Sequence, residues 1–338
     1  MALTIHKNNF NLLRLLFASL VVYSHAYALL GQEEPTLWGR SLGNLSVHGF
    51  FVISGYLICQ SYVRSPTIIL FGINRLLRIG PGLVIALIIT KFVADLCGGF
   101  KINPVPYIAN GPVWTLTWEV ICYFGLAVLG LLGALKSTSI PGFFAATWLV
   151  YLANISSVGD SYIVIAPLAM MFLFGSFIAV MEGRIDFKKF PLIGIFGLAI
   201  ITNHDVFQHI YGWTVSHIPF LWGPTITAEQ VSRVIYMVTF PLVLIYFGKH
   251  AKPIVNIEND VSYGIYIYGW PIAQTLVYFS IHQQITLSST LYFALTMALT
   301  LPIAFVSWKF IEKPSLSLKR LFNRDRRAKS AIPQEAVR

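Results

Sequence analysis

Two side chains suited to acid–base chemistry lie in long apolar stretches, where charged groups are costly. His25 lies in the block 12–31, and Glu119 lies near the start of the block 113–135. An Arg, Lys or Asp at the centre of a membrane helix costs about 2.5–3.5 kcal/mol on insertion scales, so ionisable residues there are functional candidates. An imidazole can take a proton from a hydroxyl, and a carboxylate at similar depth can orient it. We predict that His25 and Glu119 are catalytic, with hydrogen bonds to other buried groups as the structural alternative.

Arg14 and His25 are expected to share one face of a helix. Eleven steps of about 100° end roughly 20° past three full turns, and a rise of 1.5 Å per residue separates the two by about 16 Å. A helix that runs outward from the cytoplasm would place Arg14 at the inner mouth and His25 in the outer half. A side chain that snorkels from the helix end to the headgroups is the alternative explanation of Arg14.

Arg75 and Arg78 form a second pair of candidate residues, just before the apolar block 79–97. Their spacing puts both guanidinium groups on one face of a helix. Such a pair can bind phosphate oxygens bidentately, which lysines do less well. Ordinary anchoring of a membrane helix by cytoplasmic positive charge explains the pair equally well.

The elements that carry these residues are predicted to be membrane helices. Of 338 residues, 56% are hydrophobic and 11% are charged, and the mean hydropathy is +0.69, which argues against a disordered chain or a soluble domain. About 20 apolar residues span a bilayer. Ten blocks approach that length: 12–31, 45–63, 79–97, 113–135, 141–158, 162–181, 190–203, 231–248, 261–280 and 290–311.

The basic residues favour one orientation of these helices. The net charge of +10 would suggest nucleic acid in a soluble protein, but here the Lys and Arg residues lie between apolar blocks, so no nucleic-acid partner is expected. Alternate connections carry them: 64–78, 136, 184–189, 249–252 and the tail 313–338. We therefore predict an all-α polytopic membrane protein with about ten transmembrane helices and both termini cytoplasmic. It would comprise a membrane domain, 1–312, and a basic cytoplasmic tail, 313–338, with no cleaved signal peptide.

Several other polar or small residues are expected to be structural. Lys91 and Asp95 are four residues apart and can neutralise each other. The small residues in the segment 49–56 allow close helix packing. No metal site is expected from three histidines in a predicted external loop, whose spacing matches no metal motif: His204, His209 and His217. Three cysteines are interpreted as small core residues: Cys59, Cys97 and Cys122.

Six short motifs, in order along the chain, resemble those of the acyltransferase-3 family of bacterial membrane enzymes, which O-acylate surface glycans. The arginine and histidine of the first apolar block are similar to its Arg/Lys-x10-His signature, and 49–58 is similar to FFxxSGxxI. The other similar segments are Arg75 to Pro81 (RxxR, then Pro), Trp114 to Tyr123 (WSLxxExxxY), Ser262 to Pro271 (SYxxYL…P) and Ile311 to Pro314 (E-K/R-P).

This resemblance implies a membrane O-acyltransferase of the bacterial inner membrane, in contact with the lipid bilayer. It would move an acyl group, with acetyl favoured, from cytoplasmic acyl-CoA to a hydroxyl of a surface or exported glycan, which is either free or lipid-linked. The transfer would take place within the membrane domain or at its surface. It supports donor binding by Arg14, Arg75 and Arg78, and catalysis by His25. The partnership of Glu119 with His25 rests on depth alone.

Two positions depart from the family pattern. Gly269 stands where a histidine often precedes the Trp-Pro pair, so no second catalytic histidine is expected there. His48 stands where a small residue is common, and the sequence assigns it no role. A polytopic transporter of a small solute or an acylated intermediate is the alternative function, because intramembrane charges also mark transport pathways.

Overall fold

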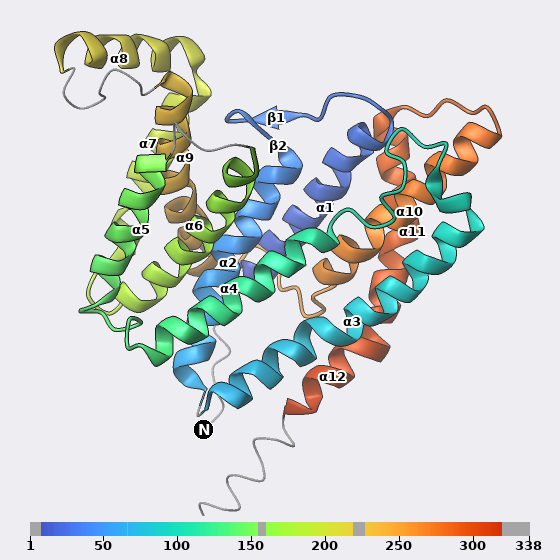
Figure 1. The fold of residues 1–338 in the computed structure, drawn as a ribbon, viewed down its shortest axis with the longest axis horizontal. Coiled ribbons are helices and arrows are strands. Elements are labelled where there is room, and N and C mark those ends of the chain that lie inside the picture. Colours follow the sequence, from blue (N-terminus) through green and yellow to red (C-terminus); the bar gives the residue numbers. More distant parts are fainter. Residues whose placement is uncertain (1–7, 66, 155–159, 219–226, 320–338) are drawn as a thin grey trace, which may run out of the picture. The chain divides into compact units, whose positions relative to one another are not determined.

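The computed structural model describes residues 8–65, 67–154, 160–218 and 227–319, and most of these residues are helical (Figure 1). Every predicted apolar block coincides with a helix, apart from residues 155–158, which lie outside the described residues. These helices are α1 (Phe10–Leu29), α2 (Leu42–Arg64), α3 (Ile68–Leu96), α4 (Val113–Leu131), α5 (Ile140–Asn154), α6 (Asp160–Met181), α7 (Pro191–Thr202), α9 (Ala228–Ile245), α10 (Ser262–His282) and α11 (Ser289–Ser307).

In the described part of the chain, six helical stretches are long and apolar enough to cross a membrane. The protein is therefore an all-α membrane protein, while the number of spans and the side of the termini stay predictions. The remaining elements are short: a hairpin of β1 (Thr36–Leu37) and β2 (Arg40–Ser41), the 3-10 turns η1 (Gly98–Phe100) and η2 (Phe187–Lys189), the π-helical turns η4 (Tyr246–His250) and η5 (Trp308–Glu312), and α12 (Lys313–Ser317). Residues 320–338 of the predicted tail lie outside the described residues.

Two elements differ from the sequence-based expectation. The predicted loop after α7 contains α8 (His204–His217), whose first turn is capped by the Asn203 side chain, 3.1 Å from the Val206 amide. Helix α3 begins eleven residues earlier than predicted, because Thr67 caps it and the helix continues through Pro81. Both helices have capping residues that a search for long apolar blocks does not detect.

The chain divides into two compact units, which are described separately. The first unit comprises Met1–His25, Glu33–Val63 and Val113–Glu258, and therefore holds most of α1, the hairpin, α2 and the helices from α4 to α9. The second unit comprises Ala26–Gln32, Arg64–Pro112 and Asn259–Arg338. Its described elements are the last turn of α1, α3, η1, α10, α11, η5 and α12.

In the first unit, α1 and α2 pack closely in antiparallel directions. The rings of Phe10 and Tyr56 lie 5.6 Å apart, and those of Phe17 and Phe50 lie 5.8 Å apart. A Cβ on Gly49 would collide with the Phe17 ring. The small residue is therefore needed for the close approach, as predicted for the segment 49–56.

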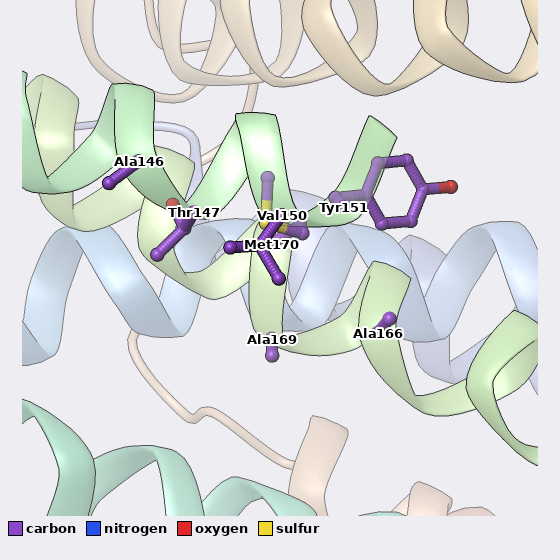
Figure 2. A pocket seen from close by; sticks show the side chains of 7 residues that line it. All are labelled: Ala146, Thr147, Val150, Tyr151, Ala166, Ala169 and Met170. Carbon is purple, nitrogen blue, oxygen red and sulfur yellow. The ribbon is translucent and has the colours of Figure 1, made fainter. Parts of the chain in front are cut away.

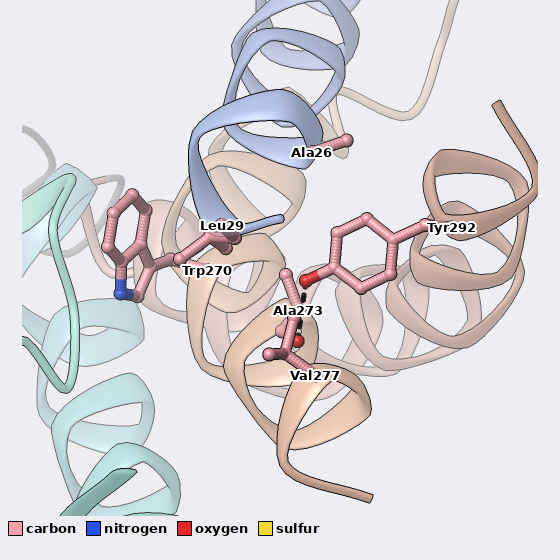
Figure 3. Packing of buried hydrophobic residues seen from close by; sticks show 6 residues of the cluster. All are labelled: Ala26, Leu29, Trp270, Ala273, Val277 and Tyr292. Atoms are coloured by element: carbon pink, nitrogen blue, oxygen red, sulfur yellow. Dashed lines mark hydrogen bonds between the residues drawn. The ribbon is translucent and has the colours of Figure 1, made fainter. Parts of the chain in front are cut away.

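In the second unit, α10 packs on α11 around a buried cluster (Figure 3). The Tyr292 hydroxyl donates to the Ala273 carbonyl at 2.6 Å, so the largest polar side chain of the cluster is satisfied. A Cβ on Gly264 would lie 2.8 Å from the Ala304 Cα, which shows that the two backbones almost touch. The cluster consists of Ala26, Leu29, Trp270, Ala273, Val277 and Tyr292.

Candidate functional site

Arg14 and His25 lie on the same uninterrupted helix, α1, as predicted, and both side chains are half-buried. His25 is the last residue of α1 that belongs to the first unit. At the other end of α1, the Asn9 side chain donates to the Phe247 and Lys252 carbonyls at 3.0 and 3.2 Å. The beginning of α1 is thus bound to η4 and to the residues that follow it.

Glu119 lies where two of the sequence motifs meet. The Ser54 hydroxyl of α2 donates to Oε1 of Glu119 at 2.8 Å, and the Tyr123 hydroxyl, one turn along α4, donates to the same oxygen. Hydrogen bonds to a charged group are stronger than those between neutral groups. The two hydroxyls can therefore stabilise a carboxylate within an apolar bundle, and the sequence motifs did not reveal that Ser54 is its partner.

The depth of Glu119 follows from the register of α1 and α2. Because Phe10 lies beside Tyr56 and the two helices are antiparallel, Ser54 is level with about Leu12. Leu12 is thirteen residues before His25, a rise of roughly 20 Å along α1. This register brings Glu119 to the level of Arg14, and the predicted partnership of Glu119 with His25 stays a prediction.

The predicted pair Arg75 and Arg78 lies within α3, and the structure distinguishes the two residues. Nη2 of Arg78 lies 2.5 Å from Oδ2 of Asp260, whose side chain is 8% exposed. The Ser262 hydroxyl also donates to Asp260. The Arg75 guanidinium lies 5.8 Å from the centre of the Phe71 ring. Arg78 therefore belongs to a buried ion pair, which sequence analysis missed because Asp260 lies outside the matched motif segments.

Three more motif segments meet in the second unit. The Tyr263 hydroxyl donates to the Ile79 carbonyl at 2.8 Å. A Cβ on Gly82 would lie 2.7 Å from the Tyr263 ring and 3.5 Å from the Glu312 side chain. Glu312 is 1% exposed and accepts a 3.2 Å hydrogen bond from Ser307. The motifs around Arg78, Tyr263 and Glu312 thus form one packed polar centre.

Lys319, beyond α12, adds a third cation near the arginine pair. Burial lowers the pKa of its ammonium to about 8, and the positive charges of Arg75 and Arg78 act in the same direction. Because Asp260 pairs with Arg78, the cations beside this ion pair that favour an anionic ligand are Arg75 and Lys319. A basic residue in a charged tail carries no signal of this proximity, so sequence analysis did not single out Lys319.

The other polar residues and cysteines that the sequence analysis named lie in an ion pair, in or near the core, or on the exposed surface. Lys91 and Asp95 form an exposed ion pair of 2.8 Å, as predicted. Cys59 and Cys97 are buried, whereas Cys122 is half-buried, and all three are free. Among the described residues, no group of three or more His, Cys, Asp or Glu side chains could hold a metal ion. The histidines assigned to a loop lie along α8 and are exposed.

The described residues of the first unit also line two cavities. A slot of about 280 Å³ between α5 and α6 has an almost wholly apolar lining, shown in Figure 2. A cavity of about 580 Å³ lies at the ends of α6 and η4, where Lys249 pairs with Glu182 and the Tyr56 hydroxyl donates to Glu182 at 3.0 Å. The larger cavity is lined by Glu182, Gly183, Arg184, Ile185, Asp186, Phe187, Lys188, Lys249 and His250.

The fold is that of a polytopic helical membrane protein. One of its helices carries an arginine and a histidine, and the same unit holds a carboxylate that accepts hydrogen bonds from two hydroxyls, so it has groups suited to acid–base chemistry. Residues 7–309 match the family model described as an acyltransferase domain, and the chain belongs to this acyltransferase-3 family. This membership supports an O-acyltransferase.

Two curated proteins are similar over most of their length. An O-acetyl transferase of Shigella phage Sf6 is 30% identical, over 92% of this chain and 97% of the relative. Nodulation protein 10 of Rhizobium leguminosarum bv. viciae is 25% identical, over 93% of this chain and 94% of the relative. No solved structure matches.

Proposed function

We propose that the protein lies in the bacterial inner membrane and transfers an acyl group, with acetyl favoured, from cytoplasmic acyl-CoA. The acceptor is a hydroxyl group of a surface or exported glycan. The observation that carries this proposal is the position of His25 and Arg14 on one helix of a chain that belongs to an acyltransferase family. The name of the phage relative, an O-acetyl transferase, supports acetyl as the group and oxygen as the acceptor atom.

The donor would be held through its phosphates by arginines. Arg75 and Arg14 are the donor ligands in this proposal, because guanidinium groups match phosphate geometry. Arg78, in its ion pair with Asp260, would hold the shape of the site. Glu119 lies at the level of Arg14, so it is suited to orient that guanidinium, while its partnership with His25 in the transfer rests on the sequence-based prediction alone.

His25 would act as the general base. As the acceptor hydroxyl oxygen attacks the thioester carbonyl carbon, its proton passes to an imidazole nitrogen. The carbon–sulfur bond then breaks, the acyl group stays on the acceptor oxygen, and the CoA thiolate receives the proton from the imidazolium. Without a base, the neutral hydroxyl is a weak nucleophile, so this step depends on His25.

The test is acyl transfer by the purified protein in nanodiscs, with acetyl-CoA as donor and surface polysaccharide fragments as acceptors. Free CoA is measured with a thiol reagent, and the acylated glycan by mass spectrometry. We expect His25→Ala to lower kcat/KM by about 10²–10⁴, the usual contribution of a positioned general base. His209→Ala, on the exposed face of α8, is the matched control and should retain activity.

Normal transfer by His25→Ala would contradict the role of this histidine. Arg75→Gln should raise the KM for acetyl-CoA about tenfold or more with little change in the KM for the glycan. Solute accumulation by proteoliposomes without CoA release would instead favour a transporter.

A further inference from the structure

The hairpin before α2 carries a half-buried arginine that no carboxylate in the described residues neutralises within ion-pair distance. The Arg40 guanidinium carbon lies 4.4 Å from the centre of the Tyr236 ring. Within the described part of the chain, the guanidinium donates a single hydrogen bond, a long one of 3.4 Å to the Trp38 carbonyl. Burial lowers the pKa of the Arg40 guanidinium and Arg233 acts in the same direction, whereas Tyr236, Tyr151 and the Glu229 carboxylate act against them. An arginine stays protonated at physiological pH in any case.

The turn that presents Arg40 is strained and firmly held. Trp38 has φ +54° and Gly39 has φ +69°, so a bulky residue occupies the left-handed region, which costs roughly 1–2 kcal/mol. The Trp38 indole donates to the Thr202 hydroxyl at 2.7 Å, and its ring lies 6.1 Å from that of Tyr236. Strain that the surroundings maintain in this way is typical of functional sites.

The tyrosine beneath Arg40 is fixed from the other side by His48. Tyr236 is fully buried, and its hydroxyl lies 3.1 Å from Nδ1 of His48, which is 2% exposed. The ring of Tyr236 is stacked on that of Phe240 at 5.1 Å. His48, to which the sequence assigned no role, therefore positions the aromatic platform under Arg40.

The base of the hairpin is attached to α1 directly beside His25. The Ser24 hydroxyl donates to Glu34, which precedes the hairpin. The Leu42 amide donates to the Pro35 carbonyl at 2.9 Å, which closes the base. In the first unit, the hairpin thus belongs to the end of α1 that carries His25, and not to the end that begins at Phe10.

We propose that Arg40, whose guanidinium lies over the Tyr236 ring, binds an anionic group of the acyl acceptor, either a sugar carboxylate or a phosphate. A guanidinium has five N–H donors, so contact with an aromatic ring and one long hydrogen bond to the Trp38 carbonyl leave donors that can bind the oxygens of an anion. The location beside His25 is suitable for an acceptor, because the hydroxyl to be acylated must reach the base. The identity of the ligand as an acceptor rests on the proposed function, whereas anion binding by Arg40 does not.

The test is direct binding to the full chain in nanodiscs, which does not require turnover. The probes are an oligosaccharide that contains uronic acid, the same oligosaccharide with its carboxyl groups reduced, and a polyprenyl-diphosphate-linked sugar. We expect the protein to bind at least one anionic probe ten times or more as tightly as the neutral one. Arg40→Gln should abolish this preference, while Arg184→Gln, an exposed arginine of the same unit, should keep it.

Two further variants separate binding from folding. Arg40→Lys retains the charge but not the planar fork, so it should recover only part of the preference. Tyr236→Phe retains the ring but loses the hydrogen bond to His48, and should weaken anion binding by a few fold. The choice between the uronate probe and the diphosphate probe identifies the source of the anion.

Equal affinity of the unaltered protein for anionic and neutral probes would overturn the proposal, as would an unchanged preference in both Arg40 variants. Arg40-dependent binding in a protein that releases no CoA would refute the proposed function and leave the anion site in place. With active protein, Arg40→Gln should raise the KM for the anionic acceptor and leave the KM for acetyl-CoA unchanged.

Discussion

The two units stabilise charged side chains within apolar helical bundles in different ways. In the first unit, Glu119 accepts hydrogen bonds from the hydroxyls of Ser54 and Tyr123. In the second unit, Arg78 forms an ion pair with Asp260, which is further bound by Ser262. Hydroxyls stabilise a carboxylate without cancelling its charge, whereas an ion pair cancels it.

This difference predicts different roles for the two centres. A carboxylate that keeps its net charge can still attract a cation or orient a ligand, so Glu119 is suited to catalysis or positioning. A neutralised arginine serves mainly to hold helices together, so Arg78 is expected to matter mainly for stability.

The largest effect is expected when the ion pair is broken on one side. Asp260→Asn leaves the half-buried positive charge of Arg78 without its partner, which should lower the free energy of unfolding by up to about 3–5 kcal/mol. Unfolding in bicelles, followed by far-UV circular dichroism, measures this change. Asp95→Asn, which removes one partner of an exposed pair, is the control and should cost at most about 1 kcal/mol.

The double variant Arg78→Gln with Asp260→Asn should regain part of the lost stability, because neither partner of the pair then keeps a charge, although the buried Glu312 also loses the interaction with Arg78. If Asp260→Asn were no more destabilising than Asp95→Asn, the distinction between the two centres would be wrong.

A smaller effect, on activity and not on stability, is expected at the other centre. Glu119→Gln keeps an oxygen that can accept from Ser54 but removes the negative charge. We expect kcat/KM to fall about 100-fold, equivalent to about 2.7 kcal/mol, and the free energy of unfolding to change by about 1 kcal/mol or less. Ser54→Ala should lower activity about tenfold. If Glu119→Gln lowered the stability as much as Asp260→Asn does, Glu119 would have a structural and not a catalytic role.

The smallest effect is a pH dependence caused by Lys319. Since its pKa of about 8 lies below the usual value for lysine, the ammonium loses its proton as the pH rises through 8. The affinity for CoA should therefore fall by a few fold between pH 7 and 9. Equilibrium binding of CoA measures it, and Lys319→Gln should remove this part of the dependence.

The same group has the opposite effect on stability. Between pH 8 and about 10.5 the unfolded chain binds more protons at Lys319 than the folded chain, so this residue makes folding more favourable as the pH rises through that range. If the CoA affinity of Lys319→Gln had the same pH profile as that of the unaltered protein, Lys319 would be excluded from the donor site.

The positions of the apolar helices were predictable because long hydrophobic blocks are a local property of the chain. Every block contains a helix, and α1 carries Arg14 and His25 together because their spacing depends only on helical geometry. The local pair Lys91 and Asp95 was predictable for the same reason. The amphipathic helix α8 was missed, because it is too short and too polar to resemble a span.

The partners of the polar residues were not predictable, because they come from segments far apart in the chain. Ser54 and Glu119 meet across 65 residues, and Arg78 and Asp260 across 182. Only the packing of α2 against α1 reveals that Glu119 is level with Arg14. The sequence by itself determined which helices form and which residues each one carries, since both depend on neighbours within a few turns. The tertiary structure alone decided which charges are neutralised, which are stabilised by hydroxyls and which, like that of Arg40, lie over an aromatic ring.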